Sequence, residues 1–270
     1  MPQTKPPLDS PNRIDANEST ARIPHSRFEQ LVSLAHMELL NWRWSWRATV
    51  TTGIIGPMIF IVLMGFFAGD EGADKLAYVL SGNVIMTLMF TNMNRMTSRF
   101  AFMRAVGTLD YYATLPVQRY LVVIATLITF FLLSLPAIVV TILFGSFFLQ
   151  LPVHLHPTLL LVVPLAALSL AGLGAYIGVA SRTLEESSTY SQIILFLFMI
   201  LGPVLIPPQN LPAIMRIAGW FSPATYGASA LRQTLLGPVT PRLLMDLLAL
   251  LAFTIGFMLL VDRKMDWRER

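Results

Sequence analysis

The sequence contains a run of 62 consecutive residues, from Tyr120 to Ser181, without a single Asp, Glu, Lys or Arg. A helix rises about 1.5 Å per residue, so this run is far too long for one crossing of a hydrocarbon layer about 30 Å thick. Its one break is the segment 151–157, whose two prolines and two histidines favour a short turn outside the hydrocarbon layer. The run therefore predicts two membrane helices joined by a turn.

The rest of the composition agrees with a polytopic membrane protein of the all-α class. Charged residues make up 13% of the chain and hydrophobic residues 55%, and the hydrophobic residues are grouped in blocks. A length of 270 residues accommodates about six spans with short loops and leaves little room for a soluble catalytic domain. The apolar blocks predict six transmembrane helices at 48–68, 76–94, 120–149, 158–180, 190–206 and 243–261.

The Lys and Arg residues near the ends of these spans are distributed unequally. Eleven lie on one side and four on the other, so the positive-inside rule places both termini in the cytoplasm. Residues 1–26 are polar and proline-rich and predict a disordered cytoplasmic tail, and residues 263–270 form a second cytoplasmic tail. The membrane-embedded body with six spans then covers residues 48–262, and 95–119 is its largest cytoplasmic loop.

The segment 27–47, before the first span, is amphipathic. An apolar stripe with helical spacing ends in tryptophans and consists of Phe28, Leu31, Val32, Ala35, Leu39, Trp42 and Trp46. This pattern predicts a helix lying in the membrane interface. A helix packed on other protein is the alternative, and both descriptions can hold at once.

The segment 207–241 predicts two short helices before the last span. Ser222 and Pro223 resemble a helix start, with serine as the cap and proline at the first helical position. Neither helix reaches the roughly 20 residues that a crossing needs. We therefore expect an external re-entrant hairpin whose backbone is covered by protein or lines a wet cavity, with a folded external loop as the alternative.

The sequence lacks the motifs of several kinds of chemistry. It has no G-x-x-x-x-G-K-[ST] phosphate loop, so we expect no ATPase site, no enzymatic activity and no cofactor on this chain. We also expect no metal site, because His154 and His156 lack a neighbouring carboxylate. The candidate residues of a cargo pathway are Asn83 and Asn92, which could instead bond between helices, together with Tyr176 and Tyr226.

Two motifs resemble those of type 2 ABC exporter permeases. The segment 104–117 reads RAVGTLDYYATLPV, which is similar to the G-T-L-[ED] and T-P-V pattern of that family, with one extra residue before Pro116. A second match runs from Leu211-Pro212 through residues 221–226 (FSPATY) to Ala230-Leu231-Arg232. The likeness covers roughly residues 28–262 and also includes the interfacial helix, six spans and external hairpin.

The resemblance implies a role for the segment 95–119 in coupling to a separate ABC ATPase subunit, which would hold ATP and Mg. Arg104 stands before the motif, Gly107 can permit a tight bend, and Thr108 can cap the next helical turn. Leu109 offers an apolar anchor, Asp110 favours the N-terminal dipole of that helix, and Pro116 would end it. The alternative is that these residues have only a structural role and form a stable loop.

The resemblance further implies an exporter in the plasma membrane, formed by two permease copies, most simply a homodimer, and two ATPases. With little charge in the spans, a hydrophobic or amphipathic cargo such as a drug or lipid is expected, and a lipid-linked glycan or polysaccharide is the second choice. A membrane-embedded lipid-modifying enzyme is the alternative of another class. It would need converging His, Asp, Glu or Ser residues at one depth, and the sequence shows no such cluster.

Overall fold

The computed structural model describes residues 27–42, 46–68, 72–109, 111 and 119–264. These residues form helices and connecting segments, and the described part of the chain contains no strand. The helices are α1 (Arg27–Trp42), α2 (Trp46–Ala68), α3 (Ala73–Leu88), η1 (Met89–Met93), α4 (Asn94–Ala105), α6 (Arg119–Leu149), α7 (Leu159–Ala180), α8 (Leu184–Leu201), η2 (Pro208–Asn210), α9 (Ala213–Gly219), α10 (Pro223–Leu235) and α11 (Arg242–Lys264). The predicted tail 1–26 and most of the tail 263–270 lie outside the described residues.

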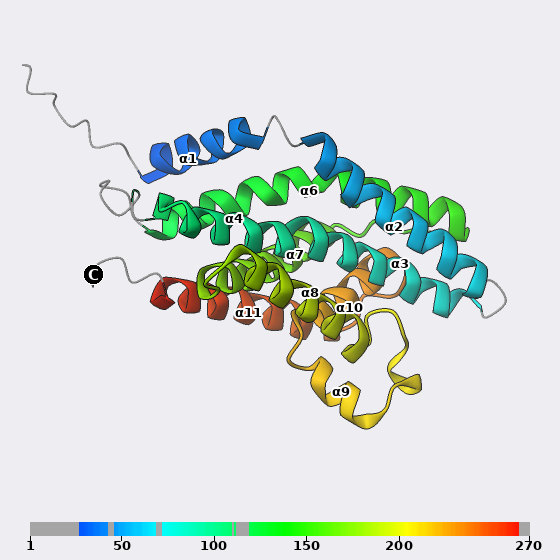
Figure 1. Cartoon of the computed structure of the whole chain (residues 1–270). Helices are drawn as coiled ribbons and strands as arrows, with labels where there is room; N and C mark the ends of the chain where they lie inside the picture. The colour runs from blue at the N-terminus through cyan, green and yellow to red at the C-terminus, as the bar shows by residue number, and fades with distance from the viewer. Residues whose placement is uncertain (1–26, 43–45, 69–71, 110, 112–118, 265–270) are drawn as a thin grey trace, which may run out of the picture.

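The helix α7 is the centre of the bundle (Figure 1). It packs against η1, α4, α6, α8, α10 and α11, and residues on every side of it are buried. A helix that is apolar all round is stable only when other helices or lipid cover it. The largest hydrophobic cluster accordingly joins α7 to α3, α10 and α11, and a second cluster joins it to α4 and α6.

Four helical segments in the described part of the chain are long and apolar enough to cross a membrane. They are Lys75–Ala105, Tyr120–Leu149, Leu159–Ala180 and Arg242–Lys264. The spans predicted at 120–149, 158–180 and 243–261 correspond closely to α6, α7 and α11. The apolar helix Gly53–Phe67 within α2 is shorter, and α8 has two glutamates in its first turn, so the count of six spans stays a prediction.

The second predicted span, at 76–94, differs from the observed helices more in length than the spans that became α6, α7 and α11. The sequence placed its end at residue 94, whereas α3, η1 and α4 follow one another as a continuous helical rod to Ala105. Within this rod, η1 is a π-helical turn, which holds one more residue per turn than its α-helical neighbours. Much of what was predicted as the start of a cytoplasmic loop is therefore helix.

The helix α8 is separated from the end of α7 by three residues, and its first turn is capped. The Thr183 hydroxyl accepts a hydrogen bond from the Glu186 backbone N–H at 3.1 Å, as a helix cap does. The Glu186 carboxylate in turn accepts the Arg182 backbone N–H at 2.7 Å. This bond, together with one from the Tyr190 hydroxyl, lowers the pKa of Glu186, which precedes the predicted span 190–206.

The amphipathic helix α1 packs against α6. Its Glu38 is 5% exposed, and the Arg99 guanidinium on α4 donates two hydrogen bonds to that carboxylate, at 2.7 and 3.1 Å. Val32 and Leu39, which belong to the predicted apolar stripe, are instead exposed on the outer side of α1. The alternative of a helix packed on protein is therefore observed, and an apolar face remains that a membrane interface could cover.

The hairpin region contains the two helices that the sequence predicted. Ser222 precedes α10 and Pro223 is its first residue, so the predicted position of the helix start is confirmed. The Ser222 hydroxyl, however, forms no capping hydrogen bond among the described residues. The helix α10 packs against α3, α7 and α11, with Ala224, Ala228 and Leu231 fully buried. In contrast, α9 carries exposed apolar side chains and extends away from the bundle (Figure 1).

Candidate functional site: the coupling segment and the external pocket

The contact between the rod and α7 depends on two glycines. A Cβ atom at Gly174 would overlap the Met93 carbonyl of η1, and one at Gly178 would overlap the Thr97 carbonyl of α4. The two helices therefore approach backbone to backbone, as small residues at four-residue spacing permit. Sequence reasoning missed this feature, although the spacing of Gly174 and Gly178 was the signal that could have revealed it.

Arg104 locks the end of α4 onto the end of α7. Its Nη1 donates hydrogen bonds to the carbonyl oxygens of Val179 and, at 2.9 Å, Ser181. These carbonyls belong to the C-terminal end of α7, where the last oxygens of a helix lack intrahelical partners and carry partial negative charge. The charge of Arg104 therefore stabilises the α7 terminus and joins it to the segment that follows α4.

Gly107 makes the bend that the sequence predicted. Its φ of 75° lies in the left-handed region that favours glycine. Its carbonyl accepts the Tyr111 backbone N–H at 3.1 Å, so a new helical turn begins at once, with Thr108 and Leu109 in helical conformation. Asp110 and Pro116 lie outside the described residues.

Leu109 is 7% exposed and belongs to a hydrophobic cluster that includes Phe100 and Met103 of α4. Its apolar contact is therefore with the core of this chain. The large apolar side chains exposed at the same bend are Val106 and Tyr111, each 62% exposed. The bend is therefore fixed to the bundle by Arg104 and Leu109, and it presents Val106 and Tyr111 outward. It consists of residues 104–109, including Gly107 and Thr108.

The predicted cargo-pathway residues are not brought together. Asn83 on α3 and Asn92 on η1 are both fully buried; their side-chain amides bond to the Val79 carbonyl at 3.2 Å and the Thr91 hydroxyl at 3.3 Å. Tyr176 on α7 packs beside the cluster that holds Leu109.

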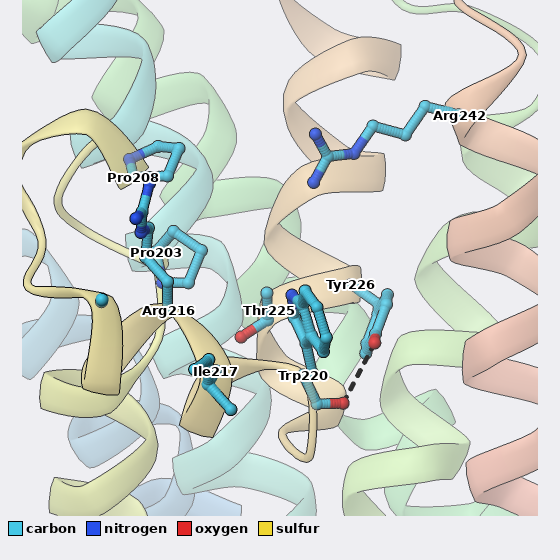
Figure 2. A pocket seen from close by; sticks show the side chains of 9 residues that line it. Pro203, Pro208, Arg216, Ile217, Trp220, Thr225, Tyr226 and Arg242 are labelled. Atoms are coloured by element: carbon cyan, nitrogen blue, oxygen red, sulfur yellow. Dashed lines mark hydrogen bonds between the residues drawn. The ribbon is translucent and has the colours of Figure 1, made fainter.

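Tyr226, the fourth, is on α10 and lines a pocket of about 380 Å³ on the hairpin side of the bundle. Figure 2 shows this external pocket, with the Tyr226 hydroxyl donating to the Trp220 carbonyl at 3.0 Å. Arg216 and Arg242 lie on opposite sides of it, and Thr225 lies between them. Sequence reasoning chose Tyr226 but missed the arginines, because α9 and α11 are brought together only by the fold.

Arg232, the last residue of the second motif, points into the bundle. Its guanidinium carbon lies 3.3 Å from the centre of the Tyr78 ring on α3. Its Nε and Nη2 atoms are buried without a hydrogen-bond partner in the described part of the chain. The motif residue therefore joins the hairpin to the rod through a cation–π contact.

These features define an all-helical, multi-pass membrane protein with a stiff bend at one end and a helical hairpin at the other. The family model described as ABC-2 type transporter matches residues 29–236. The chain therefore belongs to the ABC-2 type transporter family, as the two motifs indicated, and is a permease component without the ATPase site. A comparison with curated proteins returned no match.

Proposed function

We propose that this chain is the transmembrane permease subunit of an ATP-driven exporter, and that it moves a hydrophobic or amphipathic cargo across the plasma membrane. Members of the ABC-2 permease family typically work with an ABC ATPase partner. Two copies of the permease, with both termini in the cytoplasm and six spans each, would pair with two ATPases. The observation that carries the proposal is the attachment of the Arg104–Leu109 bend to α4 and α7.

This attachment supports a coupling role on mechanical grounds. A push on a flexible loop would be lost as loop motion, whereas the bend is held by the Arg104 bonds and by buried Leu109. The helices behind it are joined backbone to backbone at Gly174 and Gly178. A force applied at residues 106–111 therefore moves α4 and α7 together as one body.

ATP can change the conformation of such a permease only if the ATPase pair binds one conformation of the permease more tightly than the other. Equal affinity for both would shift nothing. We propose that Val106 and Tyr111 on the outer face of the bend contact the ATPase, while Leu109 anchors the bend to the permease. Asp110 and Pro116 keep the roles that the family resemblance implies.

The membrane-facing surface supports an apolar or amphipathic cargo. Large exposed side chains such as Ile59 and Phe66 on α2 and Phe196 on α8 are apolar. A lipid-linked glycan stays the second candidate and would call for a polar pathway between two copies. A lipid-modifying enzyme has less support, since no group of three His, Cys, Asp or Glu side chains gathers among the residues that the structure describes.

The test is a pair of valine substitutions in the tagged, full-length chain. Val106→Asp alters the outer face of the bend, and Val239→Asp makes the same change at an exposed position of the hairpin, where the valine is 44% exposed. Each variant is purified with its bound ATPase, and ATP-driven dye movement is measured in vesicles. We expect Val106→Asp to reduce the recovered ATPase about tenfold, a loss of about 1.4 kcal/mol of binding free energy, and Val239→Asp to leave it unchanged.

A thermal melt of each variant separates docking from folding. We expect both aspartate variants to melt like the parent chain, whereas Leu109→Ala, in the buried cluster, lowers the melting temperature. Unchanged ATPase recovery with Val106→Asp would contradict the docking assignment. Full transport by vesicles that contain no ATPase would contradict the proposed function itself.

A further inference from the structure

The external pocket is lined by Pro203 and Pro208, which follow α8, by residues of α9, by the start of α10 and by the first residue of α11. Its volume of about 380 Å³ lies at the lower end of the range for small-molecule sites, so it suits a head group better than a whole lipid. Figure 2 shows the guanidinium groups of Arg216 and Arg242 on opposite sides of this space. Both side chains are classed as exposed, so a ligand can reach them.

The pocket carries an excess of positive charge. Residues 203–246 contain three arginines, Arg216, Arg232 and Arg242, and one acidic residue, Asp246. The Asp246 carboxylate is buried and accepts hydrogen bonds from the Ser229 hydroxyl at 2.6 Å and the Gln233 amide at 3.0 Å. Over the residues that the structure describes, neither Arg216 nor Arg242 forms an ion pair with a carboxylate.

Thr225 adds a buried hydroxyl that has no hydrogen-bond partner among the residues that the structure describes. The residue as a whole is 6% exposed. A Cβ atom at Gly202 would lie 2.7 Å from this oxygen, so the adjoining turn leaves room only for glycine. A buried hydroxyl without a partner costs free energy, and a ligand oxygen that bonds to it would remove that cost.

The rim of the pocket is apolar. Ile217 of α9 and Trp220, which follows α9, line the pocket and are 55% and 66% exposed. Ile214 and Phe221 beside them are exposed still further. Tryptophan and tyrosine suit the boundary between apolar chains and water. A ligand of this pocket therefore combines a charged group with an apolar portion.

We propose that the external pocket binds the phosphate group of an anionic amphiphile. Two guanidinium groups supply charge-assisted hydrogen bonds to phosphate oxygens, and the Thr225 hydroxyl supplies a further bond. The apolar chains of the ligand lie over Ile217 and Trp220. This inference deepens the proposed function, on which its transport role rests, by naming the head-group chemistry of a lipid held at the hairpin.

The experiment measures binding to the full-length chain in nonionic detergent, without any ATPase. The probes are dihexanoyl phosphatidic acid, its uncharged analogue dihexanoylglycerol and inorganic phosphate, each titrated while thermophoresis of the labelled protein is followed. We expect phosphatidic acid to bind at least tenfold more tightly than dihexanoylglycerol. We expect the double variant Arg216→Gln/Arg242→Gln to lose at least tenfold in that affinity, and Arg263→Gln, at the other end of α11, to lose none.

Inorganic phosphate identifies the source of the ligand. If inorganic phosphate binds as tightly as phosphatidic acid, the pocket binds a soluble phosphate. If tight binding requires the acyl chains, the pocket binds a lipid. Either result supports a phosphate site. The double variant binding phosphatidic acid like the parent chain, or dihexanoylglycerol binding equally well, would overturn it. Because no ATPase is present, these outcomes are independent of whether the coupling proposal holds.

Thr225→Val separates ligand binding from folding. The substitution replaces an unpaired buried hydroxyl with a methyl group of similar size, so the ligand-free chain should melt at the same temperature or slightly higher. Its affinity for phosphatidic acid should fall several-fold. A lower melting temperature with unchanged affinity would mean that the hydroxyl serves the fold and not the ligand.

Discussion

At the scale of single residues, Arg232 shows how a motif position can serve packing. Arg232 belongs to the second family motif, and its guanidinium is stacked on the ring of Tyr78 on α3. The sequence indicates that an arginine stands here, yet it cannot indicate which ring the fold brings beside it, because Tyr78 is far away in the chain. For the same reason, the sequence did not show that Arg216 and Arg242 line one pocket.

We expect Tyr78→Leu to destabilise the chain by about 1 kcal/mol, because a cation–π contact in a partly desolvated place contributes about 0.5–2 kcal/mol. Tyr78→Phe keeps the ring and should cost much less. Chemical denaturation of the detergent-solubilised chain measures both. Repeating the pair in an Arg232→Met background isolates the contact, since the penalty of Tyr78→Leu should then shrink. An unchanged penalty in that background would show that the ring acts only through its apolar area.

At the scale of elements, the length of apolar segments with few charged residues predicted the helix positions best. It located α6, α7 and α11 closely, because a helix that crosses a membrane must satisfy its own backbone and stay apolar over its whole length. The end of the rod at Ala105 was harder to predict. Arg95, Arg99 and Arg104 mark the end of an apolar span, but they do not end a helix, since arginine is a good helix former. Arg99 contacts Glu38 of α1, and Arg104 contacts the end of α7.

The contact of the rod with α7 gives a sharp test at this scale. Gly174→Ala and Gly178→Ala each place a methyl group against backbone carbonyls that cannot move aside, so we expect each to destabilise the chain by about 1–3 kcal/mol. Gly256→Ala on α11 is the matched control, because a Cβ there meets nothing within 4 Å. Since alanine favours helix more than glycine, the control should be neutral or slightly stabilising. Melting temperatures of the three variants measure this, and equal values would show that α4 and α7 can separate freely.

At the scale of the whole molecule, the distribution of Lys and Arg predicts which end of the bundle faces the cytoplasm. The chain contains no cysteine, so a single introduced cysteine reports on one site only. We expect Val239→Cys, in the hairpin, to react with a membrane-impermeant maleimide in intact cells. Arg263→Cys, at the end of α11, should react only after the membrane is opened. The reverse pattern would invert the orientation and would place the Arg104–Leu109 bend where no cytoplasmic ATPase could reach it.

The π-helical turn at Met89–Met93 limits where residues can be inserted into this chain or deleted from it. Each residue turns a helix by about 100°, so the extra residue in the turn sets the angular position of everything that follows it in α4. Arg99 meets Glu38 and Arg104 meets the α7 terminus only at that setting. Deletion of one residue from the turn would aim both arginines at the wrong neighbours, so insertions and deletions are far less tolerable here than in the loops.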